Sequence, residues 1–311
     1  MQPRGTTWLW VTFFVLGFLW GSSYLWIKIG VETLPPLTLI AGRLSLGFLF
    51  LAVVVAAARQ ELPRSRRQYG HLLVMSVINI VIPFVLITYG ERSIDSALAS
   101  ILNSTVPLGV IVLAPLFLPE EGVTAAKVAG LAVGFAGVIL LVAPGLTSGG
   151  ASNVPGELMM VGSSLSYAAG NVYARRNVRG LRPMIPALFQ VGFAAAIIVP
   201  LALIVDDPFT RVHPAPEAFV AVAWLGFLGS GFAYLCYFTI MANWGATRTS
   251  MVAYLLPVVG IAAGALVMGD PVTPNRIAGT ALVIVGIALV SSGPALRRLV
   301  GRRADVAAEG R

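Results

Sequence analysis

Long uncharged apolar stretches alternate with short polar segments along almost the whole chain. Each stretch holds about 20 residues, the length of an α-helix that crosses the hydrocarbon core of a bilayer. The pattern predicts ten transmembrane helices, at residues 8–27, 36–58, 72–90, 96–118, 128–146, 158–174, 183–205, 218–241, 249–269 and 277–296. Arg43 is the one charged residue inside them. We therefore expect an all-α membrane protein in which residues 1–311 form a single integral membrane domain.

The composition excludes an ordinary water-soluble domain. Hydrophobic residues make up 57% of the 311 residues and charged residues 11%, against about 45–50% and 25% in soluble domains. The net charge of +8 would suit nucleic acid, but the basic residues lie between apolar blocks and form no patch with aromatic residues. The expected partners are therefore the lipid bilayer and a small-molecule substrate, with no nucleic acid.

Lys and Arg residues lie mainly on one side of the predicted helices. With the N-terminus inside, the inner segments hold 16 of them, and the outer segments hold only Lys28, Arg92, Arg211 and Arg276, with Arg43 set aside. Cytoplasmic segments of membrane proteins carry this excess of positive charge. The pattern predicts a multi-pass protein of the cytoplasmic (inner) membrane with both termini in the cytoplasm.

The sequence repeats after about 150 residues. The segment 121–130 (EGVTAAKVAG) aligns with 270–279 (DPVTPNRIAG), and Pro107 aligns with Pro257. At an offset of 147, Trp20, Tyr24, Lys28 and Arg43 align with Tyr167, Asn171, Arg175 and Gln190. The first repeat covers about 8–146 and the second about 155–296. Each holds five predicted helices, an odd number, so the second repeat is inverted, an architecture typical of secondary transporters.

The same residues resemble a known family. The segments are WGSSYLWIK (20–28), SALASILNSTVPL (96–108), the Glu120-Glu121 corner, KVAGLAVGFAGVILL (127–141) and the second copy from Ser250 onward. In their order and spacing they are similar to the EamA branch of the drug/metabolite transporter superfamily. The resemblance implies export of small metabolites, with aromatic and neutral amino acids expected as in YddG-like exporters. The second repeat departs from the pattern at Tyr167, Ala168 and Gln190, which indicates unequal halves.

Several polar and aromatic residues are candidates for a substrate cavity. Trp20, Ser23, Tyr24 and Ile27 share one helix face, and Tyr167 and Asn171 form the corresponding strip in the second repeat. Such a wall suits an amino-acid-like substrate, although helix packing explains it too. Polar positions well inside predicted helices need partners, from either the substrate or neighbouring helices. They are Asn79, Asn103, Ser104, Asn171, Tyr234 and Tyr254.

Arg43, Pro107 and Pro257 are candidates for gating. A charge within the membrane is costly, so Arg43 either reaches the outer interface, pairs with Glu32, or meets a substrate carboxylate or a gate residue. A proline inside a helix removes one hydrogen bond and can kink the helix. Pro107 and Pro257 at equivalent positions are equally compatible with hinges and with fixed bends.

The chain lacks motifs for catalysis or ATP use. No GxxxxGK[ST] or HExxH motif occurs, and the two histidines, His71 and His213, lie near loops. An intramembrane enzyme acting on a lipid or prenyl chain is the alternative, but no nucleophile–base pair supports it. We expect no enzyme, no cofactor and no metal. Facilitated exchange or gradient-driven efflux is favoured, and the pattern leaves the coupling proton or ion open.

Overall fold

The computed structural model describes residues 6–94, 96–147, 154–178, 180–208, 215–259, 262, 274–275 and 277–290. All regular structure in these residues is helical. The first half holds α1 (Thr6–Val31), α2 (Pro36–Ala57), α3 (Arg66–Ser76), η1 (Val77–Val81), α4 (Ile82–Gly90), α5 (Ser96–Asn103), α6 (Val106–Phe117), η2 (Pro119–Glu121) and α7 (Ala125–Thr147). The second half holds α8 (Val154–Asn177), α9 (Met184–Val205), α11 (Pro216–Ala223), η3 (Trp224–Phe232), α12 (Ala233–Ser250), η4 (Met251–Tyr254) and a helix at Ile277–Val290.

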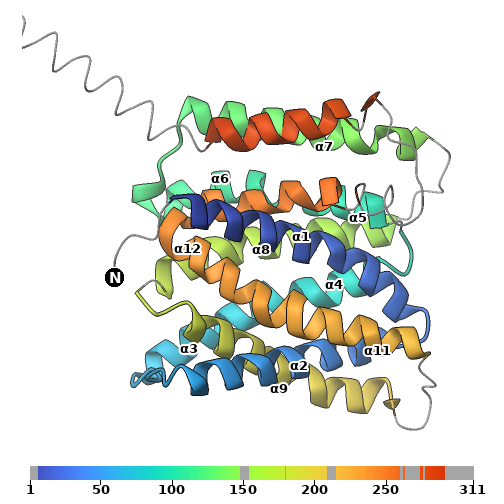
Figure 1. Cartoon of the computed structure of the whole chain (residues 1–311), viewed down its shortest axis with the longest axis vertical. Helices are drawn as coiled ribbons and strands as arrows, with labels where there is room; N and C mark the ends of the chain where they lie inside the picture. The colour runs from blue at the N-terminus through green and yellow to red at the C-terminus, as the bar shows by residue number, and fades with distance from the viewer. Residues whose placement is uncertain are drawn as a thin grey trace, which may run out of the picture.

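The helices pack side by side (Figure 1). The helix Ile277–Val290 lies with α7 along one edge of the molecule, and α2 lies with α9 along the opposite edge. Within the described ranges, five helices are long and apolar enough to span a membrane, at Thr7–Val31, Pro36–Ala57, Arg66–Gly90, Met184–Val205 and Pro216–Val259. Large apolar side chains such as Leu116 and Ile204 are exposed, as expected of a surface in contact with lipid. The all-α membrane fold is confirmed, and the number of ten spans stays a prediction.

The predicted helix 96–118 is broken into α5 and α6 at Ser104 and Thr105. The Ser104 hydroxyl donates to the Ser100 carbonyl at 2.7 Å and the Thr105 hydroxyl to the Leu102 carbonyl at 2.7 Å, so side chains compete for the helix carbonyls here. Pro107 follows in the first turn of α6, where it has no N–H to continue the preceding helix. An apolar run long enough to span the membrane does not reveal such a break.

Irregular turns occur at equivalent places in the two halves. The π-helix η1 covers Val77–Val81, and the repeat offset of 150 residues places its equivalent at 227–231, inside the π-helix η3. Likewise, Pro107 follows the break at Ser104, and Pro257 follows the 3-10 turn η4. The repeated motif at 270–273 and residue 276, the helix end after 290 and both termini lie outside the described residues.

A cation at the end of the first helix of each half makes an equivalent contact. Lys28 Nζ donates to the Glu91 carbonyl at 3.1 Å, where α4 ends. Arg175 Nη1 donates to the Met241 carbonyl at 3.2 Å in α12. The two donors differ by 147 positions and the two acceptors by 150, the offsets of the sequence repeat. Both halves therefore share a local tertiary contact as well as a sequence pattern.

The helix Ile277–Val290 approaches α7 through glycines. A Cβ atom on Gly286 would lie 2.5 Å from the Gly134 nitrogen and 2.6 Å from the Gly130 oxygen. Backbone meets backbone at this point, which only residues without a side chain allow. These glycines therefore allow the two helices to pack closely against each other.

Candidate functional site

A cavity lies among helices of both halves. Its empty space is about 730 Å³, a volume that includes the part open to solvent. The structure places nine of the fourteen candidate residues on its wall: Trp20, Ser23, Tyr24, Ile27, Arg43, Asn79, Asn103, Tyr167 and Asn171. Residues 147 positions apart in the sequence repeat, such as Trp20 and Tyr167, therefore face the same space.

The two aromatic residues that the repeat pairs have different surroundings. Trp20 is fixed by a hydrogen bond from its Nε1 to the Gly229 carbonyl at 3.2 Å, and its ring lies 5.6 Å from that of Tyr237. The Tyr167 hydroxyl has no hydrogen-bond partner among the described residues. It lines the cavity, so it can donate to or accept from a molecule bound there.

The amide side chains of the wall are held by neighbouring helices. Asn79 Nδ2 donates to Gln190 Oε1 at 3.0 Å, Asn103 donates to the Tyr24 hydroxyl, and Asn171 Oδ1 accepts from the Tyr237 hydroxyl at 3.3 Å. Asn79 lies in the π-helix η1, a type of distortion that is frequent at functional sites. Interhelical bonding and cavity lining, which the sequence presented as alternatives, occur at the same residues.

Arg43 is buried at the cavity wall, with 4% of its surface exposed. Its Nε donates to the Ser230 hydroxyl at 3.2 Å, and its guanidinium carbon lies 4.1 Å from the centre of the Phe84 ring. Among the described residues, no carboxylate lies within 4.0 Å, so the pairing with Glu32 is not formed. The side chain does not reach the surface either. The guanidinium is a cation without a bonded counter-ion.

Five candidates lie outside the cavity wall, among them Ser104, whose hydroxyl donates to the Ser100 carbonyl at 2.7 Å. Tyr234 stands behind it, donating from its hydroxyl to the Asn79 carbonyl at 3.4 Å. Tyr254 points to α7, donating to the Leu131 carbonyl at 3.0 Å. Pro107 and Pro257 are buried beside the lining residues Val106 and Leu256.

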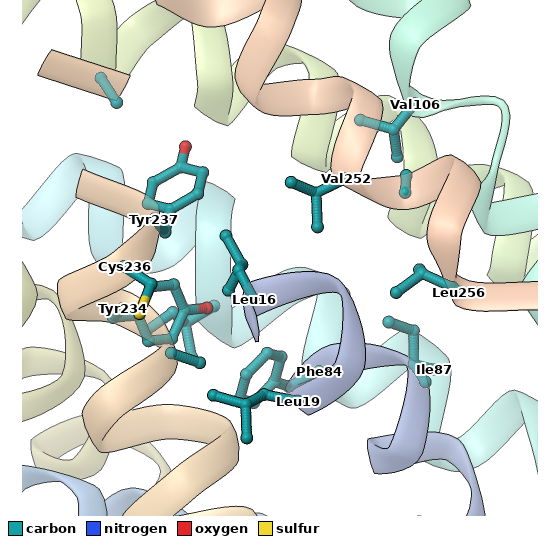
Figure 2. Packing of buried hydrophobic residues seen from close by; sticks show 14 of the residues in the cluster. Leu16, Leu19, Phe84, Ile87, Val106, Tyr234, Cys236, Tyr237, Val252 and Leu256 are labelled. Carbon is teal, nitrogen blue, oxygen red and sulfur yellow. The ribbon is translucent and has the colours of Figure 1, made fainter. Parts of the chain in front are cut away.

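Sequence reasoning missed part of the wall. Figure 2 shows its apolar side, with Ile87, Val106 and Leu256 toward one end and Tyr237 toward the other. Phe84, Thr88, Thr249 and Ser250 also line the cavity. Phe84, Ile87 and Thr88 follow the spacing of one helix face, and this signal could have found them. Among the described residues, no group of three His, Cys, Asp or Glu side chains could hold a metal ion.

Comparisons with known proteins agree with this architecture. The model of the EamA-like transporter family matches residues 7–143 and 154–292. The uncharacterized inner membrane transporter YedA of Escherichia coli K12 is 28% identical over 284 residues, 90% of this chain and 89% of that protein. The uncharacterized transporter YvbV of Bacillus subtilis 168 is 26% identical over 290 residues, 93% of each chain.

Two further matches are a relative with a described activity and a protein with a crystal structure. A probable amino-acid metabolite efflux pump of E. coli K12 is 24% identical, covering 91% of this chain and 94% of that protein. A crystal structure at 22% identity superposes with a TM-score of 0.76, covering 95% of this chain and 99% of that chain. None of these matches supports the enzyme alternative. This chain belongs to the EamA-like transporter family, and its apolar helices make it a multi-pass membrane protein.

Proposed function

We propose that the protein exports amino acids, above all neutral and aromatic ones, across the inner membrane by alternating access. The observation that carries the substrate class is Arg43, a buried guanidinium on the cavity wall with no carboxylate within 4.0 Å. A guanidinium presents parallel N–H donors that match a carboxylate. In the part of the chain that the structure describes, Arg43 donates to a protein group only through its Nε, in the Ser230 contact. The terminal NH₂ groups are therefore available to a substrate carboxylate.

The rest of the wall supports the same class. Trp20, Tyr167 and Phe84 offer ring faces to an apolar or aromatic side chain and to an ammonium group. The free hydroxyl of Tyr167 adds a polar contact that can orient the substrate. The E. coli relative at 24% identity, a probable amino-acid metabolite efflux pump, supports amino-acid metabolites as substrates and outward transport.

The repeat supports alternating access. We infer ten spans arranged as two inverted five-helix repeats, at about 8–146 and 155–296. In this arrangement Lys28 and Arg175 are equivalent residues on opposite sides of the membrane. Their matching contacts with the Glu91 and Met241 carbonyls are what this arrangement requires. The distribution of 16 inner and four outer Lys and Arg residues supports cytoplasmic termini. Inverted repeats with a cavity between them can open alternately to either side.

Counterflow in proteoliposomes tests the proposal. Vesicles loaded with an unlabelled amino acid should take up more of the labelled amino acid than empty vesicles, which serve as the control. We expect uptake of labelled phenylalanine, competition by other neutral amino acids and little competition by phenethylamine, which lacks the carboxylate. Folded protein that shows no counterflow with any proteinogenic amino acid would refute the substrate class. An ion current or a chemically altered substrate would instead indicate a channel or an enzyme.

A further inference from the structure

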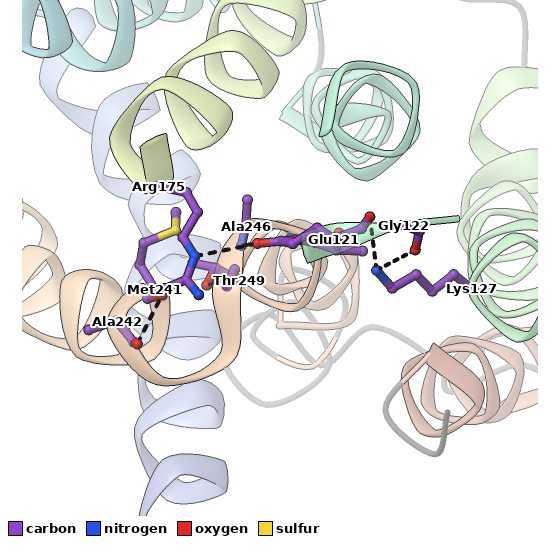
Figure 3. Close-up of polar contacts among 10 residues, drawn as sticks. Glu121, Gly122, Lys127, Arg175, Met241, Ala242, Ala246 and Thr249 are labelled. Carbon is purple, nitrogen blue, oxygen red and sulfur yellow. Dashed lines mark hydrogen bonds and ion pairs between the residues drawn. The ribbon is translucent and has the colours of Figure 1, made fainter. Parts of the chain in front are cut away.

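A polar cluster joins the two repeats away from the cavity wall (Figure 3). It consists of Glu121, Arg175, Ala246 and Thr247, and we name it the Glu121 latch. Glu121 ends the short turn η2 after α6, in the first matched family segment, whereas the other three residues belong to the second. The side chains of Glu121 and Arg175 are 10% and 21% exposed. The latch is therefore a largely buried contact between the two halves.

The latch forms where α12 is interrupted. Gly245 has a φ of 80°, a left-handed conformation that glycine adopts without strain. The helical run that starts again at Ala246 has N–H groups without partners in a preceding turn. The Glu121 carboxylate accepts from the Ala246 nitrogen at 2.6 Å, the Thr247 nitrogen at 2.9 Å and the Thr247 hydroxyl at 2.8 Å. A negative charge at this end of a helix is also favoured by its dipole.

Two cations complete the cluster. Arg175 Nε lies 3.7 Å from Glu121 Oε1, while its Nη1 binds the Met241 carbonyl. Lys127 Nζ donates to the Glu121 and Gly122 carbonyls at 3.4 and 3.1 Å, which ties down the turn that carries the carboxylate. Glu121 thus connects α8 and α12 of the second repeat to a fixed turn of the first.

The latch lies just beyond the end of the cavity wall that the second repeat forms, since Asn171 on α8 and Thr249 on α12 line the cavity within four residues of Arg175 and Ala246. On α1, the lining residues begin at Trp20 and end at Ile27, in the half of the helix nearer Val31. On α4 they are Phe84, Ile87 and Thr88, close to its end at Gly90. These are the outer ends in the proposed topology, whereas Arg175 and Glu121 belong to inner segments. The first repeat therefore lines the cavity toward its proposed outer ends, whereas the lining of the second repeat ends within about one turn of the latch.

The segment that Glu121 caps also forms part of the cavity wall. Thr249, Ser250 and Ala253 follow Ala246 within two helical turns, and all three line the cavity. Any displacement of the capped turn moves this part of the wall. Glu121 itself does not line the cavity, so it acts on the site through the turn.

We propose that Glu121 is a positioning residue whose latch keeps the cytoplasmic end of the cavity closed and opens once in each transport cycle. This inference rests on the proposed function, because it requires alternating access. Opening one side requires some contacts between the halves to break. The latch consists of polar groups that water can rebind when they separate, so its net cost of opening is small compared with parting apolar helix faces. Such a contact suits a reversible gate.

Cysteine labelling tests the gate without a substrate. The single cysteine, Cys236, is replaced by serine, and Ser250→Cys places a reporter in the cavity wall. Inside-out and right-side-out vesicles are then treated with a membrane-impermeant maleimide. We expect Glu121→Gln to raise the labelling rate from the cytoplasmic side about tenfold, because it removes the charge from three hydrogen bonds and an ion pair. Labelling from the outer side should fall.

The neighbouring exposed residue provides a matched control. Glu120→Gln removes the same charge one position away and should leave both labelling rates unchanged. Thr247→Val removes only the hydroxyl contact and should give a smaller change in the same direction, which keeps the test valid if Glu121→Gln folds poorly. Equal rates in folded Glu121→Gln, Thr247→Val and Glu120→Gln proteins would overturn the latch. Absence of amino-acid counterflow would refute the proposed substrate class but not the latch, because the labelling experiment needs no substrate.

Discussion

Replacing Arg43 by glutamine separates a carboxylate-binding role from a structural one. The guanidinium is buried at the cavity wall, donates to Ser230 and stacks on Phe84. Glutamine keeps a hydrogen-bond donor near Ser230 but removes the charge and the fork of N–H groups. The bonds to a substrate carboxylate are therefore lost, while the surrounding helices keep their apolar contacts.

The size of the effect follows from the missing bonds. A hydrogen bond to a charged group contributes about 1.5–3 kcal/mol, which corresponds to about a 10- to 150-fold change in affinity. We expect the KM for phenylalanine to rise by this factor. The Tm of the purified protein should not fall, because the substitution removes a buried charge that no carboxylate within 4.0 Å compensates. A structural arginine would give the opposite pattern, with lower stability and an unselective loss of transport.

The assay compares substrates with and without the carboxylate. Counterflow of phenylalanine and inhibition by phenethylamine are measured in wild type, Arg43→Gln and the matched control Arg92→Gln, which removes an exposed arginine. Arg43→Gln should selectively weaken the counterflow of phenylalanine. Arg92→Gln should change neither phenylalanine counterflow nor inhibition by phenethylamine. If Arg43→Gln alters the handling of both compounds equally, the carboxylate role is refuted.

Other predictions concern the rings, the helix contacts and a buried acid. Trp20→Ala and Tyr167→Ala should each raise the KM about tenfold with normal membrane insertion; unchanged counterflow would remove them from the site. Gly286→Ala should lower stability by about 1–3 kcal/mol, seen as a reduced Tm, because its Cβ would meet the α7 backbone; Gly70→Ala, with open space around it, should not. Glu91→Gln should keep or raise the Tm, since both carboxylate oxygens are buried without hydrogen bonds, and a clear drop would contradict this.

Helical spacing predicts which residues line the cavity better than the mere presence of a polar residue inside a span does. The strip of Trp20, Ser23 and Tyr24 was found from its spacing, and all three line the cavity. Tyr254 was chosen only because it is polar within a span, and it binds a carbonyl of α7 instead. A polar group in the membrane needs a partner, but the sequence does not say whether helix or substrate supplies it.

The latch was beyond sequence reasoning for a different reason. Glu121 was recognised only as part of an acidic corner between two helices, and its partners lie about 125 positions away. The partners are backbone N–H groups, which every residue carries, so no side-chain pattern marks them. Gly245 could be identified as a possible helix end, yet its positive φ and the carboxylate that caps the next turn depend on tertiary structure.

The two repeats are alike in the contacts of Lys28 and Arg175 and unlike at Arg43 and Gln190. Lys28 and Arg175 make matching contacts, and an exchange between two opposite states needs such equivalent contacts in both halves. Arg43 and its counterpart Gln190 have diverged: Arg43 lines the cavity, whereas Gln190 is buried outside the lining and accepts from Asn79. A symmetric pair of arginines would bind a substrate equally well in two orientations. In the proposed function, one arginine on one side would give the cavity a polarity and would fix the orientation of a carboxylate-bearing substrate.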